Sequence, residues 1–532
     1  MRGSRNQAIL WTIPVLMVAF LASFPAYAKY GGGTGEPNDP YLIYTSQQMN
    51  HIGQHEEDWD KHFRLMADID LSQCGGEPFN LIGTSDEPFS GHFDGNDCAI
   101  FGLHHTSADT DYIGLFACVD FGGEIRDLTL VDPNTNAGIG SNVGTLVGYL
   151  QDGAVSGCFV VGGSVSGGNN VGGLIGANSG TVVDCSSSAQ ILGEAHHLLG
   201  HCVGGLVGLN THGGISNCHS SGSVSAVHFV GGLIGMTESG VVVDCSSSVE
   251  VAGFCIGGLI GAVDGAVISN CRASGDVAGG FEAGGLIGHN ISGQINRCCA
   301  TGTVEGDLAG GLIGRDDSGV IASCFAVGSA SSSDWCGGLV GTTSGGVITD
   351  SYARGPASGN TNVGGLVGLL DGGQISRSYS CGKAQGSRDV GGLVGTSVHS
   401  YVSRCFWDTQ TSGWTSSAGG IGMKTYRMQM RSTFEGAGWE LVGRNPAGSD
   451  GAWVICEQTN YPRLTWQVPV GDLVCPDGVT MMDFSFFATH WLETECVADN
   501  DHCDGTDIDE SGAVGIEDLQ MFTDNWLEET EP

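Results

Sequence analysis

Oxygen donors recur at regular positions of one acidic segment near the C-terminal end of the sequence. Counted from its first aspartate, the donors fall at positions 1, 3, 5, 7 and 12, and the donor at position 7 is a backbone carbonyl. These residues are Asp507, Asp509, Ser511, Ala513 and Asp518. Gly512 at position 6 permits a sharp turn, and a shell of roughly six to eight oxygens suits Ca²⁺. The segment therefore predicts a calcium loop over residues 507–518.

An imperfect copy of this loop comes earlier in the chain. Its candidate ligands are Asp472, Asp477 and Asp483. Cys475 and Pro476 occupy the middle of the copy and one residue of the pattern is missing, which weakens the case for metal there. A disulfide among Cys475, Cys496 and Cys503 could replace the metal, with one cysteine left over.

The same apolar pattern follows both loops at a distance of 35 residues. The matching residues are Phe484, Phe487 and Trp491 in the first copy and Leu519, Phe522 and Trp526 in the second. This spacing places the apolar groups on one face of a helix. Residues 471–532 are therefore expected to form a small helical domain of two loop–helix units. An acidic helical tail without metal is the alternative.

The duplicated loop–helix unit resembles the dockerin type I module, which has two such copies with Asp at position 12. The resemblance implies Ca²⁺ as the cofactor and a cohesin-like scaffold protein as the partner. Met481-Met482 and Ile516-Glu517 stand near the helix starts, where that module recognises its cohesin. They do not match the usual hydroxylated pair, so the resemblance does not identify the partner.

Catalytic chemistry has weak support in the sequence, and no catalytic residue is predicted. The middle of the chain has only scattered basic residues, and the aspartates Asp184, Asp244 and Asp350 are read as solvated edge residues. Nucleophile-elbow, P-loop and HExxH motifs are absent. The histidines near residue 200 have no recognised metal-ligand spacing and are read as loop residues rather than a transition-metal site. They are His196, His197, His201 and His219.

The net charge and the N-terminal segment limit the classes of protein to which this chain could belong. The 532 residues include 19 Lys and Arg against 58 Asp and Glu, a formal charge of −39, which argues against binding to nucleic acid or anionic membranes. Arg2, Arg5, an apolar run and Ala26-Tyr27-Ala28 predict a signal peptide over residues 1–28, with an uncleaved anchor as the alternative. No later run is long enough to span a bilayer, so we expect a secreted protein without membrane insertion after cleavage.

A repeat organises the rest of the chain. The segment Gly-Gly-Leu-(Ile/Val)-Gly recurs with spacings of 26 to 32 residues, most often 27. Its leucines are Leu146, Leu174, Leu206, Leu233, Leu259, Leu286, Leu312, Leu339, Leu366 and Leu393. Each unit contains short β-type stretches separated by glycines, which predicts an all-β, parallel β-solenoid (β-helix) of about ten 27-residue coils with three strands per coil. Right-handed winding is the default for parallel crossovers.

A second marker keeps the same period. Its residues are Cys158, Cys185, Cys218, Cys245, Cys271, Cys298, Cys324, Ser351, Ser378 and Cys405. Serine in two coils suits a position selected for size, so free buried thiols are favoured over vertical disulfides. The motif leucines are expected to stack inside, and the glycines are expected to turn the corners, where φ is often positive and backbones crowd together.

Over residues 140–410 the repeat resembles the GLUG repeat family of large exported bacterial surface proteins. We divide the chain into an N-terminal cap with first coils (29–110), the solenoid (111–405), a C-terminal cap (406–470) and the dockerin-like domain. In the cap, bulky residues are expected to plug the last coil. They are Trp439, Trp453, Tyr461, Leu464 and Trp466.

Two functions are compatible with this organisation. The first is an exported, non-catalytic binding or adhesion rod for a glycan or protein ligand, either released or attached to the cell surface, that docks through its C-terminal domain. The alternative is a polysaccharide-active lyase or glycoside hydrolase of an extracellular assembly. A groove with clustered Asp and Arg or Lys would favour the enzyme, whereas a uniform Ser, Gly and Asn face would favour binding.

Overall fold

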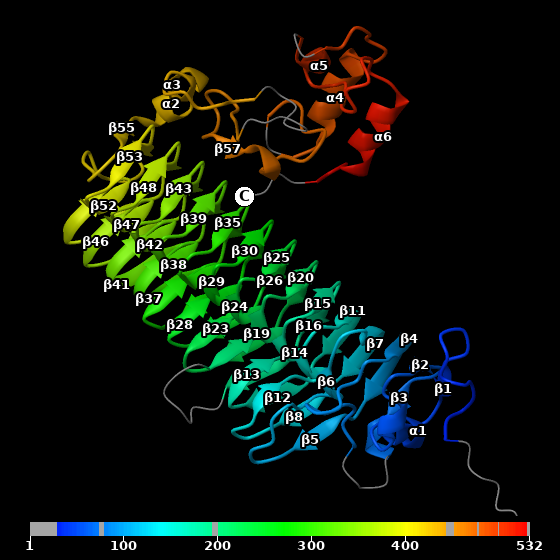
Figure 1. Ribbon diagram of the computed structural model, residues 1–532. Coiled ribbons are helices and arrows are strands. Elements are labelled where there is room, and N and C mark those ends of the chain that lie inside the picture. The colour runs from blue at the N-terminus through cyan, green and yellow to red at the C-terminus, as the bar shows by residue number, and fades with distance from the viewer. Residues whose placement is uncertain are drawn as a thin grey trace, which may run out of the picture.

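The computed structural model describes residues 29–73, 79–193, 201–442, 452–475, 478–497 and 500–528. The expected signal peptide lies outside the described residues. The described chain is mainly β-strand, and parallel strands stack into a solenoid that runs from the blue to the yellow end of Figure 1. The all-β solenoid predicted from the repeat is confirmed.

Each coil contributes to three sheets, which we call sheets 1, 2 and 3 and which hold 25, 11 and 19 strands within the described residues. One coil shows the order. Its strands are β24 (Ile234–Glu238) in sheet 2, β25 (Val241–Val243) and β26 (Ser246–Ser247) in sheet 1, and β27 (Glu250–Ala252) and β28 (Cys255–Gly257) in sheet 3. Each strand pairs in parallel with its equivalent in the next coil, as Ile234 does with Ile260.

Between residues 116 and 398, sheet 2 has one strand from each coil, so its strands show the order of the coils along the solenoid. From the N-terminal end its strands are β6 (Phe116–Val119), β10 (Val147–Leu150), β14 (Ile175–Asn178), β19 (Val207–Thr211), β24, β29 (Ile260–Asp264), β34 (Ile287–Asn290), β38 (Ile313–Asp317), β42 (Val340–Ser344), β47 (Val367–Asp371) and β52 (Val394–Val398). The coil at β6 lacks the full motif but pairs with β10 in the same register.

The motif leucines form the centre of the core, as predicted. All ten are fully buried, from Leu146 to Leu393. Stacking like residues on like residues lets every coil use the same inward position, so the core is continuous although each coil is small.

Backbone crowding, rather than left-handed geometry, explains the motif glycines. A Cβ on Gly310 would lie 1.8 Å from the carbonyl oxygen of Ile313, and the motif glycines do not have positive φ. The expected backbone crowding is therefore confirmed at this motif, whereas the expected positive φ is wrong there. Positive φ occurs instead just before the cysteine column, where Asp244 and Asn270 have φ of 54° and 53°. Short polar side chains tolerate this conformation better than most residues.

The cysteine column consists of free, buried thiols, as predicted. Cys271 Sγ donates a hydrogen bond to the carbonyl oxygen of Ser269 at 3.1 Å, and Ser351 Oγ does the same to Thr349 at 2.8 Å. Burial raises the pKa of Cys405 to about 12, which keeps its thiol protonated and unreactive at neutral pH. Serine can replace cysteine here because its hydroxyl reaches the same acceptor.

The N-terminal end of the solenoid is built from residues outside the repeat. Strands β1 (Tyr41–Ile43), β2 (His62–Leu65), β4 (His92–Phe101) and β7 (Glu124–Val131) extend sheet 1 in parallel. Helix α1 (Ser46–Ile52) buries Met49 and Ile52 in the core of these coils. The short β3 (Ile69–Asp70) pairs with β4.

The C-terminal cap lies along the side of the solenoid and does not plug its end. Its elements are β54 (Phe406–Asp408), β55 (Ile421–Met423), α2 (Thr425–Met428), α3 (Arg431–Glu435), β56 (Trp453–Val454) and β57 (Arg463–Leu464). The last coil is met instead by residues 414–418, where Ala418 N donates to Val394 O and Ser417 Oγ accepts from Leu393 N. The expected plug of bulky cap residues is therefore wrong.

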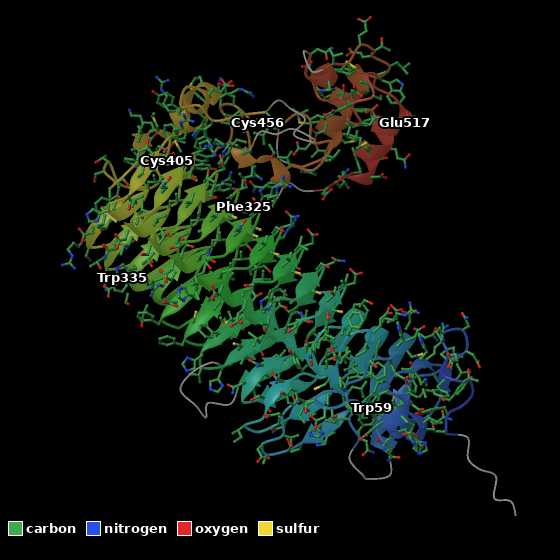
Figure 2. All side chains as sticks on the ribbon, viewed as in Figure 1. Trp59, Phe325, Trp335, Cys405, Cys456 and Glu517 are labelled. Atoms are coloured by element: carbon green, nitrogen blue, oxygen red, sulfur yellow. A yellow bond between two sulfur atoms is a disulfide. The ribbon has the colours of Figure 1, made fainter. Side chains whose placement is uncertain are left out.

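An aromatic ladder on the outer face of sheet 1 explains this placement. Phe325, Tyr352 and Tyr379 stack on successive coils with ring centroids 5.1 and 5.0 Å apart. Trp439 and Trp453 are buried against this ladder. In Figure 2, Phe325 lies on the side of the solenoid toward Cys456, and Trp335 lies on the opposite side. The ladder offers apolar area beside the coils, so the cap folds back along it (Figure 1).

Residues 478–528 contain the helices α4 (Met481–Thr489), α5 (Asp501–Asp504) and α6 (Ile516–Asp524). Phe487 and Phe522, equivalent residues of the two copies, stack with centroids 5.3 Å apart in a small separate core. Among the residues that the structure describes, no helix combines the length and apolar character needed to cross a bilayer.

Candidate functional site

Three carboxylates converge in the second acidic loop. One ligand oxygen from each of Asp507, Asp509 and Asp518 lies within 4.8 Å of the others. Asp507 and Asp518 are buried, whereas Asp509 is exposed. The three aspartates at loop positions 1, 3 and 12 thus come together as the spacing predicted.

The backbone shapes this loop around its first and last aspartates. Asp518 Oδ1 accepts from Ile508 N at 2.6 Å, and its Oδ2 accepts from Gly515 N at 2.6 Å. Asp507 Oδ2 accepts from Gly512 N at 3.0 Å, and Gly512 has a φ of 98°. This left-handed turn requires glycine.

The donor set of the loop suits a hard cation. Burial raises the pKa of Asp507, because its carboxylate loses water without gaining a full counter-charge. His502 Nδ1 is the nearby basic group, 4.0 Å from Asp507 Oδ2. Ser511 Oγ and the carbonyl oxygen of Ala513 lie 3.3 Å apart at the same turn. These oxygens fit Ca²⁺, which prefers carboxylate and carbonyl ligands.

The first loop has the same frame but fewer oxygen donors. Asp483 Oδ1 accepts from Leu473 N and Val474 N at 2.8 and 2.9 Å, as Asp518 does from the equivalent groups. Asp472 and Asp483 thus hold positions 1 and 12 of a full-length loop, and the expectation of a missing residue is wrong. Position 3 is Val474, which has no side-chain oxygen. Asp477 lies outside the described residues.

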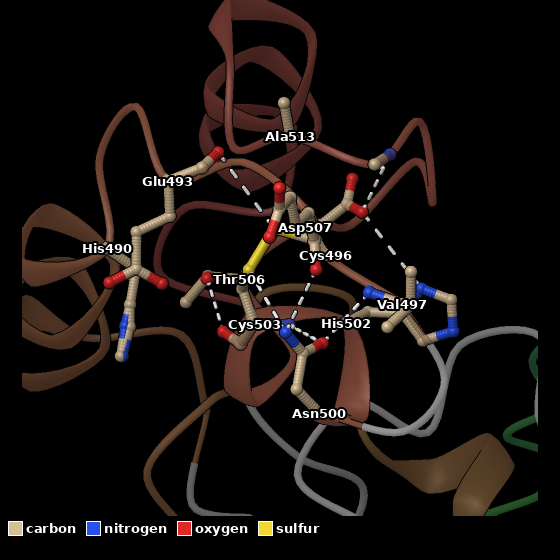
Figure 3. Close-up of a disulfide and its surroundings, with 12 residues drawn as sticks. His490, Glu493, Cys496, Val497, Asn500, His502, Cys503, Thr506, Asp507 and Ala513 are labelled. Carbon is tan, nitrogen blue, oxygen red and sulfur yellow. Dashed lines mark hydrogen bonds and ion pairs between the residues drawn. A yellow bond between two sulfur atoms is a disulfide. The ribbon is translucent and has the colours of Figure 1, made fainter.

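Two disulfides flank the acidic loops. Cys496–Cys503 lies beside Asp507, as Figure 3 shows, and Cys456–Cys475 ties the first loop to the cap. The cysteine left over in the sequence-based count therefore pairs with Cys456. Sequence reasoning missed this bond because Cys456 lies before the boundary of the expected helical domain.

Helices α4 and α6 of this domain begin with exposed apolar side chains. Met481 and Met482 at the start of α4 are 62% and 68% exposed, and Ile516 at the start of α6 is 62% exposed. Large apolar groups at this exposure are typical of interaction surfaces when they occur together. The duplication predicted the helices, but only the structure shows that these residues point into solvent.

The histidines near residue 200 do not form one site. His196 and His197 lie outside the described residues. His201 precedes β18 (Cys202–Gly204) of sheet 3 and stacks on His228, whereas His219 belongs to β21 (His219–Ser220) of sheet 1. Since the two described histidines lie on different sheets, they do not share a ligand.

A charged pocket on the first coils was missed by sequence reasoning. Its volume is about 450 Å³, and it lies on sheet 1 beside the loop that carries Asn38. Two columns of side chains form its floor. They are His62, His92 and Glu124 in one column and Arg64, Asp94 and Arg126 in the other.

Specific contacts order the floor of this pocket. The rings of His62 and His92 stack with centroids 4.3 Å apart, and His92 Nδ1 lies 2.8 Å from Glu124 Oε2. Asp94 Oδ2 lies 3.0 Å from Arg126 Nη2 and 3.8 Å from Arg64 Nε. Arg64 also donates to the side chain of Asn96.

Electrostatics give this pocket a positive component. Burial, followed by the charge of neighbouring His92, lowers the pKa of His62, so this ring is neutral at pH 7. Arg64 and Arg126 carry permanent positive charge at this pocket, and both guanidinium groups are about half exposed. The signal was available in the sequence, since His62-Phe63-Arg64 and His92-Phe93-Asp94 share one polar–apolar–polar pattern.

A second charged cluster lies where sheets 2 and 3 meet. His289 places Nδ1 3.3 Å from Glu282 Oε2 and Nε2 3.1 Å from Asp317 Oδ2. Arg315 contacts both carboxylates, at 3.4 and 3.0 Å. These groups neutralise one another, so the cluster is read as an ion-pair network that joins neighbouring coils.

Comparison with known protein families finds one matching motif in the solenoid. Residues 200–225 and 252–278 match the model of the GLUG motif. Both segments lie in the stacked coils, so the β-solenoid contains GLUG repeats.

Two curated proteins and one solved structure show partial similarity. "Halomucin" of Haloquadratum walsbyi is 33% identical over 165 residues, which is 30% of this chain and 2% of that protein. A "Putative Gly-rich membrane protein" of Evansella cellulosilytica is 35% identical over 123 residues, 22% of this chain and 14% of that protein. This chain thus matches only a small part of either relative. A crystal structure titled as a "putative immunoglobulin A1 protease" from Bacteroides ovatus aligns with a TM-score of 0.35 and 21% identity, over 52% of this chain and 78% of that one.

Proposed function

We propose that this protein is an exported, non-catalytic β-solenoid that docks onto a cohesin-like scaffold protein through a Ca²⁺-dependent, dockerin-like C-terminal domain. The observation that carries the proposal is the pair of exposed apolar helix starts, at Met481-Met482 and Ile516, next to two related acidic loops. The coils then act as a rod that presents binding surface away from the docking point.

Export is supported by chemistry and by similarity. Two disulfides, Cys456–Cys475 and Cys496–Cys503, favour an oxidising compartment. One relative is named as a membrane protein, which is compatible with a place at the cell surface. The predicted signal peptide would direct the chain to export from the cell.

In this proposal Ca²⁺ is held by the second loop, through Asp507, Asp509, Ser511, Ala513 and Asp518. The ion would neutralise the converging carboxylates and fix the turn that leads into α6. The first loop keeps the frame of Asp472 and Asp483, with the Cys456–Cys475 disulfide as its restraint.

Replacing Asp507 by asparagine is expected to abolish one Ca²⁺ site per chain, or to weaken it at least about tenfold, because the variant loses a buried ligand charge. Calorimetric titration of the full-length protein with Ca²⁺ measures this. Asp524→Asn on the exposed end of α6 is the matched control and should leave uptake unchanged. Equal Ca²⁺ uptake by wild type and Asp507→Asn would contradict the assignment.

Docking is tested by pull-down of secreted scaffold proteins from the source organism, with and without EDTA. We expect capture that EDTA abolishes and that Met482→Asp and Ile516→Asp each reduce at least about tenfold, since a charge at the centre of an apolar interface is costly. Tyr401→Asp, an equally exposed position on the solenoid, is the control. Capture that persists in EDTA, or that Met482→Asp leaves intact, would refute docking through this domain.

One observation favours a second candidate function, a polysaccharide-active enzyme. The pocket on the first coils clusters Asp94 with Arg64 and Arg126, beside the His92–Glu124 pair. Clustered carboxylate and basic groups are what such chemistry requires. Release of new chain ends from polyuronates or β-glucans, abolished by Asp94→Asn, would replace the non-catalytic proposal with this one.

A further inference from the structure

Cations are concentrated at one place on the N-terminal half of the solenoid. Between residues 30 and 271 the sequence has only three Lys and Arg residues, which are Lys61, Arg64 and Arg126. Two of them, Arg64 and Arg126, line the same pocket because β2, β4 and β7 stack in register. In a chain with a formal charge of −39, this placement marks a site where positive charge is needed.

The pocket also has acceptors for hydroxyl groups. Asp94 lies between the two arginines, and Glu124 pairs with His92, with its side chain 38% exposed. A guanidinium group binds a carboxylate through two parallel hydrogen bonds, and a carboxylate accepts from sugar hydroxyls. The floor therefore offers both kinds of contact within one volume.

We propose that this pocket binds a uronate residue, a sugar that bears one carboxylate, within an acidic polysaccharide. The carboxylate of the ligand would pair with Arg126 and Arg64, and the hydroxyls of its sugar ring would donate to Asp94 and Glu124. The inference rests on the proposed function in one respect. If the solenoid is a binding rod, its ligand is a polymer, and the uronate is then one residue of a polysaccharide.

The charge balance separates a uronate from other ligands. A phosphate monoester carries up to two negative charges, so Asp94 and Glu124 oppose it more strongly than the single charge of a carboxylate. A neutral glycan would leave the guanidinium groups without a matching anion. The ligand that satisfies all four charged groups has one carboxylate and several hydroxyls.

The test is calorimetric titration of the full-length protein with oligogalacturonate at pH 7 in EDTA, which keeps the Ca²⁺ loop out of the measurement. Wild type should bind, and Arg126→Gln should weaken binding at least about tenfold, because a charge-assisted pair is lost. Arg126→Lys should fall between them, since lysine keeps the charge without the bidentate geometry. Arg388→Gln, an exposed arginine on the far coils, is the matched control and should bind like wild type.

Competing ligands and folding controls make the outcome decisive. Equal-length β-glucan and dextran sulfate should each bind at least about tenfold more weakly than oligogalacturonate.

Circular dichroism and the unfolding midpoint confirm that each variant is folded, and Arg64→Gln provides a second variant if Arg126→Gln is not. Absence of wild-type binding, equal binding of dextran sulfate, or binding unchanged by loss of both arginines would overturn the proposal. Asp507→Asn should leave uronate binding intact, so failure of docking and failure of this site can be told apart.

Discussion

Replacing Gly310 by alanine is expected to destabilise the solenoid by about 3 kcal/mol or more. Gly310 ends β37 (Val304–Gly310), and a Cβ there would lie 1.8 Å from the carbonyl oxygen of Ile313 and 2.6 Å from the backbone nitrogen of Gly341. Ile313 follows Gly310 in the same coil and Gly341 lies in the next coil, so relief requires both the tight turn after Gly310 and the spacing of the coils to change. Urea unfolding followed by circular dichroism measures the change.

The matched control for this prediction is Gly214→Ala in β20 (Gly214–Ser216). No atom lies within 4 Å of the added Cβ, and Gly214 does not have a positive φ. We expect a change within about 0.5 kcal/mol, because an open surface position accepts a methyl group. Equal destabilisation by both variants would show that close packing of backbone atoms is not the reason why glycine occupies the motif positions.

Replacing Trp453 by alanine is expected to release the C-terminal cap from the side of the solenoid, at a cost of about 3–5 kcal/mol. Trp453 is fully buried, and its ring centroid lies 4.6 Å from that of Trp439 and 5.8 Å from that of Tyr379. Its Nε1 donates to Asp350 Oδ1 at 3.1 Å, so the substitution also leaves this carboxylate, which is buried rather than solvated as the sequence predicted, with one donor fewer.

Hydrogen exchange and limited proteolysis localise this effect. The variant should lose protection over residues 424–442 and 452–467, while the coils from 201 to 300 keep theirs, because each coil contacts only its neighbours. Trp335→Ala on the opposite side of the solenoid is the control, since Trp335 is only partly buried and does not touch the cap. Unchanged protection of the cap in Trp453→Ala would contradict the lateral packing.

Much of the architecture follows from the repeat because it depends on local pattern. Leu312 and its equivalents recur at one interval, and a parallel ladder places equivalent residues above one another, so the inward column can be read directly from the sequence. The same reasoning identifies the cysteine column and the acidic loop at Asp507. It also predicts the backbone crowding at Gly310 but not its φ, because the dihedral angles of the corner depend on how consecutive strands of the coil are joined.

What the sequence alone determined is the part of the protein that repeats: the strands, their stacking, the inward columns and the duplicated acidic loops. Each of these depends on residues one period apart or less. Only the tertiary structure decided where Trp453 packs and that Cys475 pairs with Cys456. These contacts join segments without a shared period, and the balance of apolar burial and charge pairing that selects them exists only once the coils are stacked.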